Sequence, residues 1–298
     1  MKSIYSLTLF LALSISAFAT PCASTVYQTT WKGRTRQYMI CVPAGLPANP
    51  AMVFYLHGTS DGTVAPWQAI DQWSEIAIEN NFIVVFPEST LNTFNDGWWY
   101  WDAYDLDFAF YPNPPDDAGF LRNLIEILSA QYSANPTEIF MTGLSSGALM
   151  TQRMGVTSPD LLAAIAPVSG QLYMRQMTDG WTAPPKPFAK ISVLEMHGDA
   201  DADLPYCGNT PHYNNWDLTG MTLPSVDVDM NFWLAANGLP ANRKPLCTAG
   251  APSAGVDGVD EVGNGVEVQF VREIGVGHVW PSADYQTVWS FFAAHPKR

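Results

Sequence analysis

The sequence predicts an α/β protein with a mainly parallel central sheet and helices on both faces. Short continuous apolar runs alternate along the chain with segments in which apolar residues recur at helical spacing. Strands buried on both faces read as unbroken apolar runs, and helices between them allow parallel pairing. No repeat, low-complexity tract or linker divides the 298 residues, so we expect a single domain over residues 20–298.

The predicted strands share short apolar runs, and they are residues 51–56, 82–86, 138–142, 164–168, 191–196 and 266–271. The predicted helices share apolar residues at helical spacing, and they are residues 70–77, 120–128, 146–157 and 285–292. Asn80 and Asn81 are suited to end the first helix, and Asp116 is suited to cap the second. An earlier run, "QYMICV" at residues 37–42, predicts an antiparallel edge strand. Sites in such sheets lie beyond the carboxyl ends of the strands, which tests every candidate residue below.

The first residues have the layout of a secretory signal peptide. Lys2 precedes an apolar run over residues 4–18, and Ala17-Phe18-Ala19 forms an A-x-A cleavage site. We therefore expect residues 1–19 to be removed and the protein to be secreted. The alternative is a membrane anchor, but the run is short and three serines interrupt it.

The charge limits the classes of partner. Asp and Glu number 28 against 14 Lys and Arg, which gives a formal net charge of -14. This charge repels nucleic-acid phosphates and anionic lipid, so we expect no nucleic-acid or membrane partner. A neutral or uncharged polymer is easier to accommodate. We expect the protein to be a monomer.

The four cysteines are consistent with export. They allow three pairings, and no C-x-x-C motif is present, so zinc-ribbon and thioredoxin interpretations fail. Proximity along the chain favours Cys22–Cys41 and Cys207–Cys247. The alternative is four buried free thiols.

Gly143-Leu144-Ser145-Ser146-Gly147 forms a G-x-S-x-G pentapeptide between a predicted strand and a predicted helix. The motif is typical of a sharp turn that strains the central serine, and side chains in place of the glycines would collide there. The turn exposes the hydroxyl at a helix N-terminus, whose partial positive charge favours a developing anion. Ser145 is the candidate nucleophile. The pentapeptide alone is a weak signal, and the alternative is an ordinary glycine turn.

A serine nucleophile needs a general base. His278 lies in "GVGHVWP", a few residues beyond the last predicted strand, and the flanking glycines indicate a loop with unusual backbone requirements. The alternative is a structural histidine that caps the following helix. His57 and His197 directly follow strands, whereas His212 and His295 lie in polar or terminal segments.

The base needs an orienting acid, which should lie between nucleophile and base along the chain. The stretch "HGDADADLPY" offers Asp199, Asp201 and Asp203, and their spacing leaves all three open. Alternating carboxylates also suggest a calcium loop. That match fails because the sixth position lacks Gly and the twelfth lacks Glu. We expect no metal.

An oxyanion hole needs a backbone N–H from the loop after an early strand, beside the one that follows the nucleophile. The stretch "LHGTSDG" at residues 56–62 is in that place, and its small residues allow close approach. We assign the two donors to Thr59 and Ser146. His57 is then expected to brace the loop.

These stretches together resemble the esterase family of feruloyl esterases, acetylxylan esterases and polyhydroxybutyrate depolymerases. The matching segments are "LHGTSDG", "DDAGFLRNLI", "GLSSGALMT", "HGDADADLP" and "GVGHVWP", over about residues 35–295. The resemblance implies the α/β-hydrolase fold, a serine esterase and no cofactor. It aligns the acid with Asp201 and the base with His278. Leu204 replaces the family's usual Val after the acid, and Ala118 replaces another Val in the second motif, which suggests slightly looser packing there.

The substrate is less well defined by the sequence. Residues 94–120 are densely aromatic, and an aromatic wall would suit a ferulate ring or xylan sugars. We expect Trp99, Trp101 and Trp280 to contact substrate, although the tryptophans of this segment could equally pack the loop itself. We expect feruloyl esterase activity, and the alternatives are activity on acetylated xylan and on polyhydroxybutyrate. A non-enzymatic alternative is a carbohydrate-binding protein that resembles a hydrolase.

Overall fold

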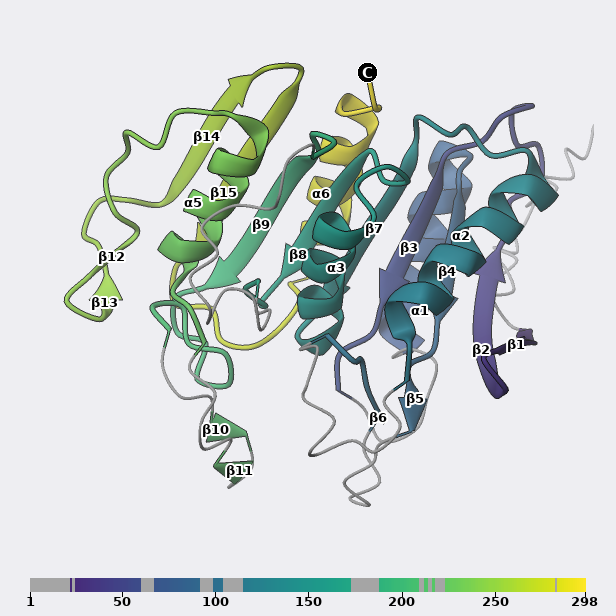
Figure 1. The fold of residues 1–298 in the computed structure, drawn as a ribbon, viewed down its shortest axis with the longest axis horizontal. Coiled ribbons are helices and arrows are strands. Elements are labelled where there is room, and N and C mark those ends of the chain that lie inside the picture. The colour runs from purple at the N-terminus through teal and green to yellow at the C-terminus, as the bar shows by residue number, and fades with distance from the viewer. Residues whose placement is uncertain are drawn as a thin grey trace, which may run out of the picture.

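A nine-stranded sheet runs through the centre of the protein (Figure 1). The computed structural model describes residues 22, 25–59, 67–91, 99–103, 115–172, 188–208, 212–213, 216–217, 223–281 and 283–298, so the predicted signal peptide lies outside the described residues. In sheet order, the strands are β1 (Val26–Trp31), β2 (Arg34–Cys41), β4 (Ile83–Pro87), β3 (Met52–Leu56), β7 (Ile139–Leu144), β8 (Ala164–Val168), β9 (Ser192–Gly198), β15 (Val266–Glu273) and β14 (Gly258–Gly263).

The sheet is mainly parallel, as the sequence predicts. Strands β4, β3, β7, β8, β9 and β15 pair in parallel, and antiparallel pairs lie toward both edges of the sheet. The carboxyl ends of β3, β7, β9 and β15 therefore meet at one edge. This is the edge at which the candidate residues are expected.

Helices cover both faces of the sheet. On one face lie α2 (Asp117–Tyr132), α3 (Ser146–Thr157) and α5 (Val226–Asn237), and on the other lie α1 (Trp67–Asn80) and α6 (Asp284–Ala294). In Figure 1, α3 lies in front of β7 and β8, and the yellow α6 lies behind the sheet. The helices on each face bury a separate apolar core against the sheet.

The unbroken apolar runs follow from this two-sided burial. In β3, Met52, Phe54 and Leu56 face the α2–α3–α5 core, whereas Val53 and Tyr55 face the α1–α6 core. Because successive strand side chains point to opposite faces, a strand covered on both sides must be apolar throughout.

Several elements lie outside the predicted set. Strands β1 and β14 and helix α5 were not predicted, and neither were the short pairs β5 (Thr90–Leu91) with β6 (Trp99–Tyr100), β10 (His212–Tyr213) with β11 (Trp216–Asp217), and β12 (Cys247–Thr248) with β13 (Ala251–Pro252). Strand β14 joins β15 through Asn264 and Gly265, both with positive φ. An Asn-Gly pair favours such a hairpin turn, so the sequence does carry that signal.

Both predicted disulfides are confirmed. Cys22 is bonded to Cys41, and Cys207 is bonded to Cys247. Within the part of the chain that the structure describes, no helix is both long and apolar enough to cross a bilayer.

Candidate active site

The turn between β7 and α3 holds Ser145 in a strained conformation. Its φ of 57° and ψ of -122° lie in a region that side chains rarely adopt. The Ser145 backbone N–H donates to Val168 O on β8 at 3.1 Å, and the Ser145 carbonyl accepts from Leu149 N of α3 at 3.0 Å. The turn is thus held by the neighbouring strand and by the helix that follows it.

The two glycines of the pentapeptide are needed for close packing. A Cβ at Gly143 would lie 2.6 Å from Gly147 O and 2.7 Å from Leu56 O. A Cβ at Gly147 would lie 2.2 Å from Leu56 O and 2.5 Å from His57 O. These separations are too short for any side chain, so the collisions are with the turn itself and with the end of β3.

His278 and Asp201 meet at the same edge of the sheet. His278 Nδ1 lies 2.7 Å from Asp201 Oδ2, and the other carboxylate oxygen accepts the backbone N–H groups of Asp203 at 2.9 Å and Leu204 at 2.8 Å. Burial alone would raise the pKa of Asp201, but hydrogen bonds and charge from His197 and His278 outweigh it and hold the pKa well below its usual range. Asp201 is therefore ionised at neutral pH.

The serine and the imidazole share this edge without direct bonding. Ser145 directly follows β7, and His278 lies a few residues beyond β15. Among the residues that the structure describes, no hydrogen bond joins Ser145 Oγ to the His278 ring. Such bonds are often long in the absence of substrate and tighten in the complex.

His197 contacts Asp201, the candidate acid, and the sequence analysis did not identify this contact. Its ring is fully buried, and Nε2 donates to Leu204 O at 2.8 Å while lying 3.3 Å from Asp201 Oδ2. The ring edge also contacts Tyr206, with ring centroids 5.8 Å apart. His197 thus supports the loop that presents Asp201. Its position four residues before Asp201 is the feature of the sequence that could have identified this contact.

The loop after β3 lies against the nucleophile turn. A Cβ at Gly58 would be 3.3 Å from both Ser145 Cβ and Leu144 O, so the segment that leads to Thr59 passes beside the serine. Ser146 begins α3, and the first N–H groups of a helix have no acceptor within it. The two segments expected to supply oxyanion donors, the loop after β3 and the start of α3, thus both lie next to Ser145.

His57 braces this loop. Its Nε2 accepts the backbone N–H of Ser89 at 3.1 Å, so Nδ1 carries the proton and donates to Gly58 O at 2.6 Å. Burial lowers the pKa of His57 to about 4, so the ring is neutral at physiological pH. The bracing role expected from the sequence agrees with these contacts.

Two of the three tryptophans expected to contact substrate are buried. Trp101 is 1% exposed, and its Nε1 donates to His57 O at 2.8 Å. Trp280 is 8% exposed and stacks on Tyr285 with ring centroids 4.8 Å apart. Protein atoms surround both rings, so a contact of either ring with substrate stays a prediction. The Trp99 backbone lies in β6, but its side chain is outside the described part, as are residues 92–98 and 104–114.

A buried ion pair supports Trp101. Arg36 Nη2 lies 2.7 Å from Asp117 Oδ1, and the two side chains are at most 1% exposed. The guanidinium also lies over the Phe120 ring at 3.9 Å. Asp117 Oδ2 accepts the backbone N–H of Asp102 at 2.7 Å, which fixes the residue next to Trp101. Sequence reasoning missed this pair because its members are far apart in the chain.

The remaining aspartates of the candidate loop have other roles. Asp199 pairs with Arg272 rather than with His278, and Asp203 contributes its backbone N–H to Asp201. Tertiary contact thus distinguishes Asp201 among the three candidates. In the described segments, no group of three or more His, Cys, Asp or Glu side chains is arranged to hold a metal ion.

A serine on a strained strand-to-helix turn, with a histidine–carboxylate pair at the same edge of a mainly parallel sheet, defines an esterase of the α/β-hydrolase fold. Comparison with known proteins gives its family. Residues 38–214, more than half of the chain, match the family described as Phospholipase/Carboxylesterase, and the chain belongs to that family.

The relatives agree with this class. Acetylxylan esterase A of Talaromyces purpureogenus is 26% identical over 306 residues, which cover 94% of this chain and 77% of that protein. Poly(3-hydroxyalkanoate) depolymerase C of Paucimonas lemoignei is 32% identical over 144 residues, 47% of this chain, and the match spans only 33% of that longer protein. The solved structure of an acetyl xylan esterase from Aspergillus awamori superimposes with a TM-score of 0.61 at 21% identity, covering 90% of this chain and 99% of that one.

Proposed function

We propose that this protein is a secreted serine esterase whose catalytic triad is Ser145, Asp201 and His278. The observation that carries the proposal is the 2.7 Å hydrogen bond from His278 Nδ1 to Asp201 Oδ2, at the edge that also presents the strained serine. A carboxylate that holds Nδ1–H leaves Nε2 as the nitrogen that accepts a proton. The side chain of His278 is 14% exposed, so a substrate can approach it.

The reaction proceeds in two halves. His278 takes the proton of Ser145 as the hydroxyl attacks an ester carbonyl, and Asp201 stabilises the positive ring that results. The backbone N–H groups of Thr59 and Ser146 hold the oxyanion. His278 returns the proton to the departing alcohol, and water then hydrolyses the acyl-enzyme by the same route. This chemistry requires no cofactor.

Acetyl esters of a polysaccharide such as xylan are the favoured substrates. An acetylxylan esterase aligns with 94% of this chain, which supports this class. The burial of Trp101 and Trp280 weakens the support for an aromatic site that would hold a ferulate ring, so feruloyl esters take second place. A polyester is the other candidate because a polyhydroxyalkanoate depolymerase shares 32% identity over about half of the chain.

Secretion is supported by the amino-terminal sequence and by the two disulfides. Disulfides persist in oxidising compartments and are rare in the cytosol. Mass spectrometry of secreted material should find a mature protein that begins after Ala19. An intact amino terminus would contradict cleavage there.

Labelling with a fluorophosphonate probe tests the serine. We expect the purified protein to be labelled and Ser145→Ala to lose both labelling and at least about a thousandfold in kcat. Ser290→Ala, on the exposed face of α6, is the matched control and should behave as the unaltered protein. Failure of the unaltered protein to react would favour the carbohydrate-binding alternative. A panel of acetylated xylan, methyl ferulate and polyhydroxybutyrate film then ranks the substrates.

A further inference from the structure

Two loops carry the acid and the base, and backbone contacts join them directly. The acid loop is defined as residues 199–208 and the base loop as residues 274–281. Asp199 N donates to Glu273 O at 3.1 Å, and Ala200 N donates to Val276 O at 3.0 Å. A Cβ at Gly198 would lie 2.2 Å from Val276 O, so the two loops are packed as closely as backbones allow.

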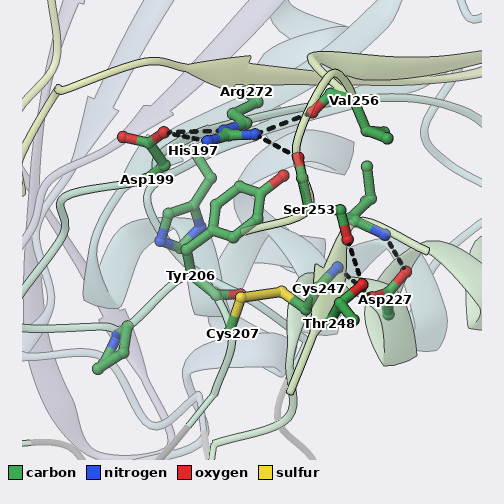
Figure 2. Close-up of a disulfide and its surroundings, with 12 residues drawn as sticks. His197, Asp199, Tyr206, Cys207, Asp227, Cys247, Thr248, Ser253, Val256 and Arg272 are labelled. Atoms are coloured by element: carbon green, nitrogen blue, oxygen red, sulfur yellow. Dashed lines mark hydrogen bonds and ion pairs between the residues drawn. A yellow bond between two sulfur atoms is a disulfide. The ribbon is translucent and has the colours of Figure 1, made fainter. Parts of the chain in front are cut away.

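The Asp199 side chain adds a second connection between the loops. Its Oδ1 accepts the backbone N–H of Gly275 in the base loop at 2.6 Å. Its Oδ2 accepts from Arg272 Nε at 2.8 Å and lies 2.7 Å from Arg272 Nη2. Figure 2 shows the contacts between Asp199 and Arg272, with Asp199 at one side of the guanidinium and the carbonyls of Ser253 and Val256 at the other.

Arg272 is itself held from several sides. Its Nη1 donates to Ser253 O at 2.9 Å and to Val256 O at 3.1 Å, and its guanidinium lies 6.0 Å from the ring of Tyr206 in the acid loop. The side chains of Arg272 and Asp199 are only 13% and 11% exposed. A forked pair this far from solvent has a fixed geometry, unlike a mobile surface ion pair.

We propose that Asp199 is a positioning residue that fixes the acid loop to the base loop, and so sets the Asp201–His278 hydrogen bond. The inference rests on the proposed triad. Asp199 lies two positions before the acid, and Gly275 lies three before the base, so a shift at this contact moves both partners. Catalytic groups must be held within a fraction of an ångström, and a displacement of about 1 Å can cost about a hundredfold in rate.

Asp199 performs this role as a carboxylate. Burial opposes ionisation, but the hydrogen bonds from Gly275 and Arg272 outweigh it and lower the pKa of Asp199. One oxygen accepts from Gly275 of the base loop, and the other accepts from Arg272 of β15, the strand that precedes this loop. Alanine removes both contacts, whereas asparagine keeps one acceptor and loses the charge that Arg272 requires.

The test compares Asp199→Asn and Asp199→Ala with the unaltered protein. We expect kcat for p-nitrophenyl acetate to fall at least about tenfold in Asp199→Asn and further in Asp199→Ala, with KM changed less than about twofold. The low-field NMR signal of the His278 Nδ1 proton, assigned by its loss in His278→Gln, should weaken in parallel. Asp160→Asn is the matched control because it breaks the bidentate Arg122–Asp160 pair, and Asp160 follows the C-terminal end of α3, the opposite end from Ser145.

The outcomes separate positioning from stability. If Asp199→Asn lowers the melting temperature but leaves kcat and the His278 signal unchanged, the proposal is overturned. If Asp199→Ala does not fold, Asp199→Asn and Arg272→Lys decide, since each keeps one of the contacts. If the unaltered protein fails to react with fluorophosphonate, the proposed function fails, whereas the NMR signal still reports whether Asp199 sets the Asp201–His278 bond.

Discussion

His278 and Asp201 are joined by a 2.7 Å hydrogen bond although they lie 77 positions apart in the chain. The parallel pairing of β9 with β15 brings them together, because it places the carboxyl ends of both strands side by side. One carboxylate oxygen of Asp201 accepts this hydrogen bond, and the other accepts two backbone N–H groups. The carboxylate therefore has one orientation, and the imidazole that it holds has one tautomer.

Asp201→Asn is expected to lower kcat by about ten-thousandfold with little change in fold. Asparagine would keep its carbonyl oxygen on the backbone N–H groups of Asp203 and Leu204 and would turn its NH₂ group toward His278. Nδ1 must then accept, so the ring proton moves to Nε2 and blocks that nitrogen as a base. Steady-state kinetics with p-nitrophenyl acetate measures the loss.

Asp260→Asn, on the exposed strand β14, is the control and should keep full activity. Circular dichroism should show the same spectrum for both variants. Retention of more than about a tenth of the activity by Asp201→Asn would remove the carboxylate from the mechanism.

The sequence predicts the sheet and the strained turn at Ser145 because both depend on local rules. Unbroken apolar runs identify strands that are covered on both faces, and β3, β4, β7, β8 and β9 all match such runs. Gly143 and Gly147 mark the nucleophile turn because backbone atoms lie where their side chains would be. These signals lie within a few residues of the feature that they specify.

Other features depend on contacts that the chain order does not encode. Asp199, Asp201 and Asp203 are chemically alike, and only the placement of His278 and Arg272 distinguishes them. Sequence gives the aromatic content of a segment but not the direction in which each ring points, so it left open whether Trp101 packs within the protein or contacts substrate. Helix α5 was missed because its buried residues include Asp229, which breaks the apolar spacing.

The two disulfides are expected to differ in their effect on activity. Cys207 lies in the acid loop, and its partner Cys247 is held by a hydrogen bond of its N–H to Asp227 at 2.7 Å (Figure 2). Cys41 lies in β2, away from the acid and base loops. Replacing Cys207 and Cys247 together by serine should lower both kcat and stability, whereas replacing Cys22 and Cys41 should lower stability alone.

The loss of unfolding free energy should be similar in the two variants, about 4 kcal/mol for the bond that closes 40 residues and about 3 kcal/mol for the one that closes 19. Guanidinium denaturation and esterase kinetics on the same samples measure the two effects. Equal loss of kcat in both variants would contradict a special role for the acid-loop disulfide.

A buried carboxyl pair beneath the nucleophile helix should make stability fall as pH rises. Glu195 of β9 and Asp229 of α5 are fully buried, and Gln152 of α3 donates to Asp229 Oδ2 at 2.7 Å. Burial raises the pKa of both groups, and the negative charge of Asp229 raises that of Glu195 further. The pKa of Asp229 rises to about 6 and that of Glu195 rises well above its usual range, so the folded pair still holds protons at pH values where ordinary carboxyls have lost them.

The direction of this change in stability with pH follows from proton binding. Between the ordinary pKa of a carboxyl, about 4, and these raised values, the folded state binds more protons than the unfolded state, so the free energy of unfolding decreases as pH increases. Glu195→Gln removes one titrating group and keeps a donor for Asp229. Its melting temperature relative to the unaltered protein should therefore increase as pH rises from about 4 through neutral pH. Thermal melts across this range measure the difference, with Glu126→Gln on the exposed face of α2 as the control. A difference that stays constant with pH for Glu195→Gln would show that the pair does not titrate in this range.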